Sequence, residues 1–172
     1  MKIGLLSDSH RKAGKTRKAV DLLLKEGARF LLHAGDIVEE ESLQILRESG
    51  VPTKTVLGNN DGPLREVMDR YDLFSEPLRF TLEELRFKMM HHPYHFMPLE
   101  EDVIIFGHTH QVLSSFNGKN LYLNPGEVCG RDTGKSSCML LETTAEAFRV
   151  QTFFRYNGDN VWHNEEVEFA RK

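Results

Sequence analysis

Short apolar runs alternate with stretches of helical periodicity over the first half of the chain. The apolar runs span only a few residues each, which suits buried strands. Between them, apolar side chains recur every three or four residues, and Gly27 and Gly50 follow these stretches as helix stop signals. A strand–helix–strand–helix–strand order is typical of right-handed crossovers in a parallel sheet. The predicted strands are residues 3–6, 30–32 and 53–57, and the predicted helices are residues 16–26, 39–48 and 63–68.

The second half of the chain changes to strand-like runs joined by tight turns. Asn117-Gly118 is a strong hairpin signal, and Glu83-Glu84 separates two further strand-like runs. The tail over residues 158–172 is polar around Trp162, and its pattern predicts no element. The predicted strands of this half are residues 78–82, 85–90, 103–106, 113–116, 121–123, 137–143 and 147–154.

Composition places the chain among ordinary globular proteins. It has 172 residues, of which 40% are hydrophobic and 28% charged, so it can bury a sizeable core. We find no internal repeat, low-complexity tract or linker. We therefore expect one domain over residues 1–172.

Net charge and cysteine content indicate which binding partners and which cellular compartment to expect. The net charge is −4 without a long basic run, so we expect no nucleic-acid partner. No apolar segment approaches the ~20 residues that span a bilayer, and residues 1–6 run into charged residues too soon for a signal peptide. Cys129 and Cys138 are too few for a disulfide framework. We expect a cytoplasmic protein with reduced thiols and no membrane contact.

The most informative polar stretch is Gly107-His108-Thr109-His110, which follows the apolar run over residues 103–106. In extended backbone, side chains two residues apart point to the same side, so the two imidazoles would converge at a strand end. Gly107 allows the backbone to bend or to approach a ligand. Neutral imidazole is the commonest metal ligand in proteins. A polar turn with histidines bonded to backbone is the alternative.

Four other polar clusters also follow strand-like runs, and the carboxyl ends of parallel strands meet at one edge of a sheet. Taken singly, Asp8 could be a helix cap and Asn59 a turn residue, but five such clusters are hard to explain by capping. The donors include no thiolate, which favours Mn²⁺, Fe²⁺, Ni²⁺ or Zn²⁺. Seven donors suit two metal ions that share a carboxylate, and Asp36 is central among them. The candidate ligands are Asp8, His10, Asp36, Asn59, His91, His108 and His110.

The ordered motifs Asp-x-His, Gly-Asp, Gly-Asn-x-Asp, His and Gly-His-x-His resemble those of the calcineurin-like metallophosphoesterases, over residues 8–126. The short chain, with Asn124-Pro125-Gly126 after the last motif, is most similar to the small stand-alone prokaryotic phosphodiesterases of that family. The resemblance implies a four-layer α/β/β/α sandwich of two mixed sheets flanked by helices. It also implies a phosphoric ester hydrolase that cleaves a P–O bond of a small phosphodiester with a hydroxide held between two divalent metal ions.

The resemblance also implies a role for each candidate residue. The residues expected to take part in catalysis are Asn59, Asp61 and His91, and Asp61 would orient a neighbouring group without binding metal. Mn²⁺ is the first expectation for the metal, with Ni²⁺, Fe²⁺ and Zn²⁺ as alternatives, and no organic cofactor is expected. One metal ion would take Asp8, His10, Asp36 and His110, and the other Asp36, Asn59, His91 and His108.

Two positions depart from the family pattern. Many members have a histidine after the motif asparagine that protonates the leaving oxygen, whereas this chain has Asn60. Losing such an acid typically costs about 10²–10⁴-fold, most for poor leaving groups, so we expect better activity on activated diesters than on alkyl monoesters. The fourth motif reads His91-His92, and alignment favours His91 as the ligand over His92. His92 and His95 could replace the missing acid or simply face solvent, and His33 is expected to be structural.

Two other functions compete with the phosphodiesterase. A phosphomonoesterase or nucleotidase of the same fold would differ in substrate, and a site closed by basic residues would favour it over an open groove. A weakly active protein-binding scaffold is the other, because a retromer subunit of this fold acts in that way. That subunit has lost metal-ligand histidines that this chain retains. Exposed edge strands could also pair two copies into a homodimer.

Overall fold

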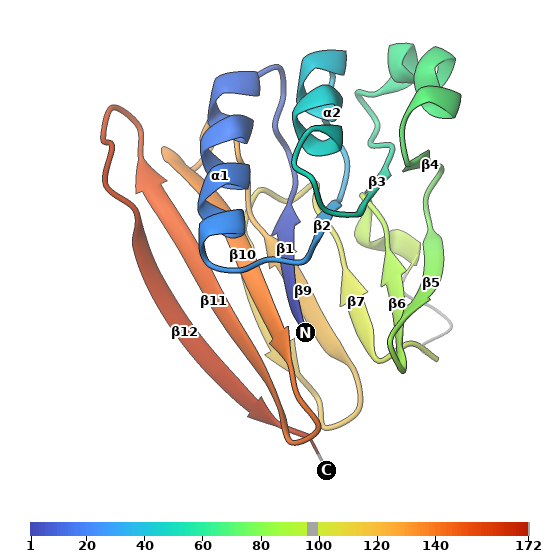
Figure 1. Cartoon of the computed structure of the whole chain (residues 1–172), viewed down its shortest axis with the longest axis vertical. Helices are drawn as coiled ribbons and strands as arrows, with labels where there is room; N and C mark the ends of the chain where they lie inside the picture. The colour runs from blue at the N-terminus through green and yellow to red at the C-terminus, as the bar shows by residue number, and fades with distance from the viewer. Residues whose placement is uncertain (96–99, 172) are drawn as a thin grey trace.

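Two mixed β-sheets packed face to face form the framework of the protein (Figure 1). The computed structural model describes residues 1–95 and 100–171. The seven-stranded sheet has, in spatial order, β12 (His163–Ala170), β11 (Ala147–Tyr156), β10 (Lys135–Thr143), β1 (Lys2–Leu6), β2 (Phe30–His33), β3 (Thr53–Val56) and β4 (Leu73–Phe74). The five-stranded sheet has β5 (Leu78–Leu82), β6 (Leu85–Met89), β7 (Val103–Ile105), β9 (Leu121–Pro125) and β8 (Val112–Phe116).

Each sheet contains a parallel segment that the crossover pattern requires. Strands β1, β2, β3 and β4 run parallel to one another, and β10, β11 and β12 continue the sheet antiparallel. In the other sheet β6, β7 and β9 are parallel, with β5 and β8 antiparallel at the edges. The sequence prediction of a parallel β–α–β–α–β unit is therefore confirmed.

The main hydrophobic core lies between the two sheets. Alternate residues of the strands point into it, so that Leu5 and Leu32 from one sheet meet Phe87 and Ile105 from the other, all fully buried. The intervening residues of the seven-stranded sheet, such as Leu6, point to the opposite face and pack under the helices. Both faces of the central parallel strands are thus covered, which explains why their sequences read as continuous apolar runs.

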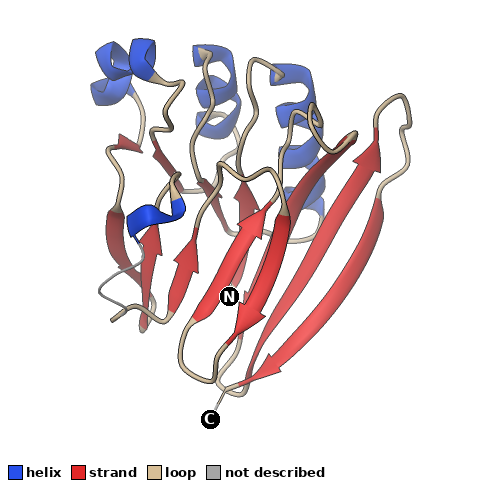
Figure 2. Ribbon diagram, turned by 180° about the vertical axis from the view of Figure 1, so that it is seen from behind, coloured by secondary structure: helices blue, strands red, loops and turns tan. Residues whose placement is uncertain are grey.

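Helices cover the outer face of the seven-stranded sheet (Figure 1). They are α1 (Ala13–Lys25), α2 (Glu40–Arg47) and the 3₁₀ helix η1 (Gly62–Arg70). On the other side of the molecule, the 3₁₀ turn η2 (Pro93–His95) lies against the five-stranded sheet (Figure 2). The predicted fold of two mixed sheets flanked by helices is confirmed, and within the described residues the fourth layer consists of η2.

The structure adds elements that local sequence patterns did not reveal. The tail pairs with β11 as the edge strand β12, from Phe154 opposite His163 to Ala147 opposite Ala170. Its Val167 and Phe169 pack against the core while charged residues alternate outward. The two-residue strand β4 and the earlier start of α1 at Ala13 were also unforeseen. No helix among the described residues is long and apolar enough to cross a membrane.

Candidate metal centre

The loops that follow five parallel strands of the two sheets meet at one end of the molecule. The arrowheads of β1, β6 and β7 point to this same end in Figure 1, and the two sheets bring their loops together across the main core. Ligand sites of open parallel sheets form at such ends because the chain leaves each strand there. The predicted donors follow the strands as Asp8 and His10 after β1, Asp36 after β2, Asn59 after β3, His91 after β6, and His108 and His110 after β7.

Three of these donors converge in a first cluster. Asp8 Oδ1 lies 3.7 Å from His10 Nε2 and 3.1 Å from His110 Nε2. The two imidazole Nε2 atoms are 3.3 Å apart. Asp8 is fully buried, and its Oδ1 atom has no hydrogen-bond partner among the described residues. A buried carboxylate oxygen that faces two imidazole nitrogens is suited to a cation.

A second cluster forms around Asp36. Its Oδ2 atom lies 3.4 Å from His91 Nε2 and 3.5 Å from His10 Nε2, so that it stands between the two clusters. The side-chain oxygen of Asn59 is 3.1 Å from His91 Nε2. The ring of His108 packs edge-on against that of His91, with centroids 5.1 Å apart. The seven predicted donors are thus brought to one place, with Asp36 in the centre.

A hydrogen bond behind His91 and carboxylate contacts behind His110 hold the orientation of these two rings. The Nδ1–H of His91 donates to the carbonyl of Ala34 at 2.8 Å, which directs Nε2 towards Asp36 as the atom available to a metal ion. On the other side of the centre, His110 Nδ1 lies 2.7 Å from Asp132 Oδ2 and 3.2 Å from Glu127 Oε2. Both rings therefore present Nε2 to the site.

Two residues of the loop after β3 hold the centre in a different way. Asn60 donates to Asp36 twice, from its backbone N–H to Oδ1 at 2.9 Å and from its side chain to Oδ2 at 2.7 Å. Asp61 is buried and accepts from the backbone N–H groups of Val38 and Gly58, both at 2.7 Å. Asp61 thereby joins the loop after β2 to the loop after β3, and its side chain forms no hydrogen bond or ion pair with the donors among the described residues.

His91 and His92 have different environments. Glu76 accepts from the backbone N–H groups of both residues and from His92 Nδ1 at 2.7 Å. His92 therefore faces Glu76, whereas His91 faces Asp36 and Asn59. This geometry favours His91 over His92 as the donor. The side chain of His95, which was the other candidate for a replacement acid, lies outside the described residues.

The loops hold these donors in unusual backbone conformations. Left-handed φ angles occur at five donors, and such angles are uncommon for residues other than glycine. Strain of this kind is typical of functional sites, where the surrounding structure maintains it. Gly107 has no side chain because a Cβ there would lie 2.9 Å from Asp8 Oδ2 and 2.7 Å from the Ala34 carbonyl. The five donors are Asp8 (54°), His10 (39°), Asp36 (56°), His108 (66°) and His110 (58°).

The electrostatics of the cation-free site keep both carboxyl groups ionised. Burial opposes ionisation of Asp8, yet the adjacent imidazoles of His10 and His110 hold its pKa far below the usual range. Burial likewise opposes ionisation of Asp36, but His91 and Asn60 lower its pKa to about 2. Burial would lower the pKa of His91, and the neighbouring Asp36 and Asp8 raise it to about 9. Without a metal ion, the centre therefore holds two ionised carboxylates beside a protonated His91 at neutral pH, and a bound cation would take the place of that proton.

The donor spacing fits divalent metal ions. Ligand atoms bound about 2.1 Å from one metal ion lie about 3.0–3.4 Å from one another in octahedral or tetrahedral geometry. The distances within the first cluster are 3.1, 3.3 and 3.7 Å, and Asp36 Oδ2 lies 3.4 Å from His91 Nε2. Carboxylate and imidazole donors suit Mn²⁺, Fe²⁺, Ni²⁺ and Zn²⁺. The residues present fit a metal centre.

A third group of donors, His110 with Glu127 and Cys129, is less suitable. The carboxylate of Glu127 is saturated by hydrogen bonds from its own loop, including the N–H groups of Arg131 and Thr133. Burial and the contact with Glu127 raise the pKa of the Cys129 thiol to about 12, and only a thiolate binds metal well. This group therefore serves to position His110.

Sequence reasoning missed the acidic residues behind the histidines. Glu127 directly follows the Asn124-Pro125-Gly126 turn, so that motif pointed to its neighbourhood, and Asp132 lies in the same loop. Nothing in the local sequence around Glu76 indicated its bonds to His91 and His92. Such partners are found only when the tertiary structure places them.

Comparisons with known proteins agree with this geometry. The family profile described as the calcineurin-like phosphoesterase superfamily domain matches residues 1–146. Phosphodiesterase MJ0936 of Methanocaldococcus jannaschii is 30% identical over 166 residues, which cover 87% of this chain and 97% of that protein. Phosphodiesterase YfcE of Escherichia coli is 25% identical over 146 residues, which cover 74% and 79%. The crystal structure of Chaetomium thermophilum Vps29 aligns over 100% of both chains, with a TM-score of 0.81 and 16% identity, which shows the same fold alone.

Proposed function

This chain belongs to the calcineurin-like phosphoesterase superfamily, as its motifs predict, and we propose that it is a phosphodiesterase that requires two divalent metal ions. The observation that carries the proposal is the triangle of Asp8 Oδ1, His10 Nε2 and His110 Nε2 beside Asp36 Oδ2. In this triangle the buried Asp8 Oδ1 faces the two imidazole nitrogens and has no hydrogen-bond partner among the described residues. The similarity of this chain to two small phosphodiesterases also supports phosphodiester hydrolysis as its activity.

The two clusters divide the donors between the metal ions. The first ion would be held by Asp8, His10 and His110, and the second by Asn59, His91 and His108. Asp36 would contribute to both, because its Oδ2 atom lies between His10 and His91. When bound, the ions supply positive charge for the phosphoryl oxygens and a hydroxide nucleophile at neutral pH. We propose Mn²⁺ as the usual occupant, since all donors are carboxylate, imidazole or amide groups.

The chain's own residues would bind the substrate and hold the donors. Arg11 and Arg131 line a hollow of about 200 Å³ together with His10 and Asn60, at the mouth of the centre. Their guanidinium groups suit the non-bridging oxygens of a phosphate ester. Asn60 fixes both oxygens of Asp36, and Ala34 and Asp132 fix the rings of His91 and His110. Asp61 contributes by joining the loops that carry Asp36 and Asn59.

Protonation of the leaving group is the step of the reaction that the residues of this centre support least. The side chain of Asn60, at the position of the usual acid, is committed to Asp36 and has no proton to give. His92, the nearest replacement, is bonded to Glu76. We therefore propose small diesters with a good leaving group as substrates. The two arginines at the mouth favour a second candidate, a phosphomonoesterase, because they would suit a terminal phosphate.

The test compares hydrolysis of bis(4-nitrophenyl) phosphate and 4-nitrophenyl phosphate by metal-stripped protein. Mn²⁺, Ni²⁺, Zn²⁺ and Mg²⁺ are added back singly, and bound metal is counted by elemental analysis. We expect two ions per chain and diester cleavage that exceeds monoester cleavage. The metal-dependent activity is compared between the wild-type protein and Asp36→Asn. His163→Gln is the control variant, because His163 is exposed on β12 and is not one of the donors. Faster monoester cleavage would favour the second candidate.

Two results would contradict the proposal. Diester hydrolysis that survives both metal removal and Asp36→Asn would exclude the metal mechanism. Tight binding of two ions without hydrolysis of either ester would favour a protein-binding scaffold, and the search would then turn to partner proteins.

A further inference from the structure

A second hollow lies beside the metal centre, between the start of α1 and the turn that joins β11 to β12. We call it the α1 pocket. It has a volume of about 620 Å³ and is lined by residues 11–15, Lys18, Glu39, Glu41 and residues 155–160. In Figure 1 the β11–β12 turn stands beside the upper end of α1, where the helix begins. Its size would accept a phosphorylated group of a small molecule.

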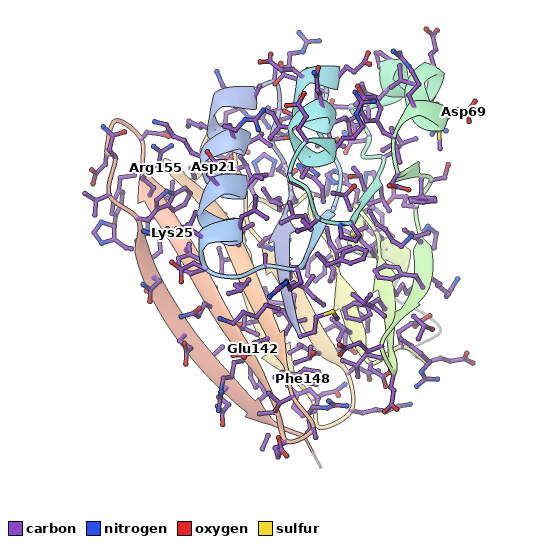
Figure 3. All side chains as sticks on the ribbon, in the orientation of Figure 1. Asp21, Lys25, Asp69, Glu142, Phe148 and Arg155 are labelled. Carbon is purple, nitrogen blue, oxygen red and sulfur yellow. The ribbon has the colours of Figure 1, made fainter. Side chains whose placement is uncertain are left out.

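Arg155 is the unusual residue of this pocket. It lines the pocket although only 6% of its surface is exposed, and its Nε atom has no hydrogen-bond partner among the described residues. No described carboxylate lies within ion-pair distance of its guanidinium, which stacks over the ring of Trp162 at 5.3 Å (Figure 3 labels Arg155). A buried cation without a counterion is costly unless a ligand compensates it.

The other cations of the α1 pocket add to this charge. Arg11, Lys12, Lys15 and Lys18 line it, and α1 has no acidic residue in its first turn, although Glu39 accepts from the N–H of its first residue, Ala13. Cations at a helix N-terminus oppose the helix dipole, which favours anions there. Lys15 donates to the neutral oxygens of Cys129 and Asn157. Burial and the nearby Arg155 and Lys12 lower the pKa of Lys15, although Cys129 and Glu127 act to raise it.

The acidic residues of the rim, Glu39, Glu41 and Asp159, form no ion pair with these cations among the described residues. Arg155 is nevertheless one of the groups that lower the pKa of Asp159, after its backbone hydrogen bonds from Val161 and Asn160. Glu39 Oε1 accepts from Ala13 N and Ser42 Oγ. Asp159 Oδ1 accepts from the backbone N–H groups of Asn160 and Val161 within its own turn. Five cations and three carboxylates line the pocket, so its lining carries a net positive charge.

We propose that the α1 pocket is a second phosphate-binding site, in which Arg155, Lys12 and Lys18 receive a phosphate monoester group. A planar guanidinium with two ammonium groups suits the several acceptor oxygens of a phosphate dianion. Arg11 lines both this pocket and the hollow over His10 and Asn60, which connects the two sites. A second phosphate on the substrate is therefore the expected source, and that part rests on the proposed function.

Trp162 provides a direct test, since it is the single tryptophan of the chain and contacts Arg155. Inorganic phosphate is titrated against metal-free and metal-loaded protein while tryptophan fluorescence is recorded, with chloride at matched ionic strength as reference. We expect a saturable change that Arg155→Gln and Lys18→Gln each weaken about tenfold, as expected for a hydrogen bond to a charged group. Lys18→Gln leaves Arg155 stacked on Trp162. This variant therefore distinguishes weaker phosphate binding from a direct effect of the substitution on the fluorescence of Trp162.

The matched control removes the same charge from the same helix outside the pocket. Lys25 lies in the last turn of α1 (Figure 3). The variant Lys25→Gln should therefore leave the apparent affinity for phosphate unchanged. A titration without saturation in the wild-type protein would overturn the proposal. Equal weakening by Lys25→Gln would overturn it as well, because the effect would then be one of net charge.

A pair of substrates identifies the source of the phosphate. Thymidine 5′-(4-nitrophenyl phosphate) and its 3′-phosphorylated form release the same nitrophenolate and differ only in the second phosphate. We expect a KM about tenfold lower for the 3′-phosphorylated form, and we expect Arg155→Gln to remove this difference. Equal KM values with a saturable fluorescence response would assign the site to a separate phosphate ligand. A fluorescence response without hydrolysis of either substrate would contradict the proposed function and leave the phosphate site intact.

Discussion

The metal centre and the α1 pocket both contain a buried charged side chain with an atom that no described residue satisfies, but the charges have opposite sign. In the centre the atom is Oδ1 of Asp8, which faces His10 and His110. In the pocket it is Nε of Arg155, which lies among lysines. Buried charge is costly unless it is compensated. The difference indicates that the first region binds cations and the second an anion, side by side.

The comparison predicts that the two regions can be disabled separately. Asp36→Asn should lower diester hydrolysis by more than about 100-fold, because even residues that only orient a ligand are worth 10–100-fold. The same variant should keep the phosphate response of Trp162. Arg155→Gln should do the opposite, with hydrolysis of bis(4-nitrophenyl) phosphate unchanged. Loss of both properties in either variant would mean that the two regions form one site.

Metal ions should stabilise the fold through the centre. A ligand at 100 times its dissociation constant adds about 2.7 kcal/mol to the free energy of unfolding, which for this chain length raises Tm by about 5–10 °C. Differential scanning fluorimetry with and without Mn²⁺ measures the rise. Asp8→Asn should remove most of it, whereas Arg155→Gln should retain it. An unchanged Tm in the wild-type protein at saturating Mn²⁺ would argue against a preformed centre.

The acid behind His110 should contribute a smaller part of the metal affinity. Asp132→Asn removes the negative partner that lies 2.7 Å from His110 Nδ1, and such partners are worth about 10–100-fold in affinity. Competition with a chromophoric chelator measures the loss. Asp69→Asn is the control, since Asp69 is exposed on η1 and labelled in Figure 3. Equal losses of metal affinity in Asp132→Asn and Asp69→Asn would show that Asp132 does not position His110.

His33 sharpens the comparison, because it is buried with an unpartnered Nδ1 yet carries no charge. Burial is the largest cause that lowers its pKa, to about 4, with Asp8 and Asp36 opposing and His91 and His10 contributing. Below about pH 6.5 the unfolded chain is protonated at His33, whereas the folded protein keeps His33 neutral until the pH approaches 4. Stability should therefore fall as pH decreases from 6.5 towards 4.

The variant that tests this pH dependence is His33→Gln. Between pH 7 and 5.5 the His33 contribution is about 1 kcal/mol, measured by urea unfolding of metal-free wild-type and variant protein. The variant should lose that part of the pH dependence while the other histidines keep theirs. Parallel pH profiles for the two proteins would show that His33 titrates normally.

The sequence by itself determined much of the fold. Residues 3–57 predicted the parallel β–α–β–α–β unit, because the period of apolar positions is a local property of each element. The hairpins around Glu83-Glu84 and Asn117-Gly118 were also readable, since their turn residues sit between strand-like runs. The tail was not, because β12 is a half-exposed edge strand that only its pairing with β11 defines.

The sequence also named the candidate donors, because every one follows a strand and parallel strands end at one edge. Tertiary structure alone distinguished the environments of His91 and His92, through Glu76, which lies 15 and 16 residues earlier in the chain. It likewise placed Asp132 behind His110 and buried Arg155 beside α1. These contacts join loops of different strands and have no local period. Their energies depend on burial and distance, which the packing of the two sheets decides.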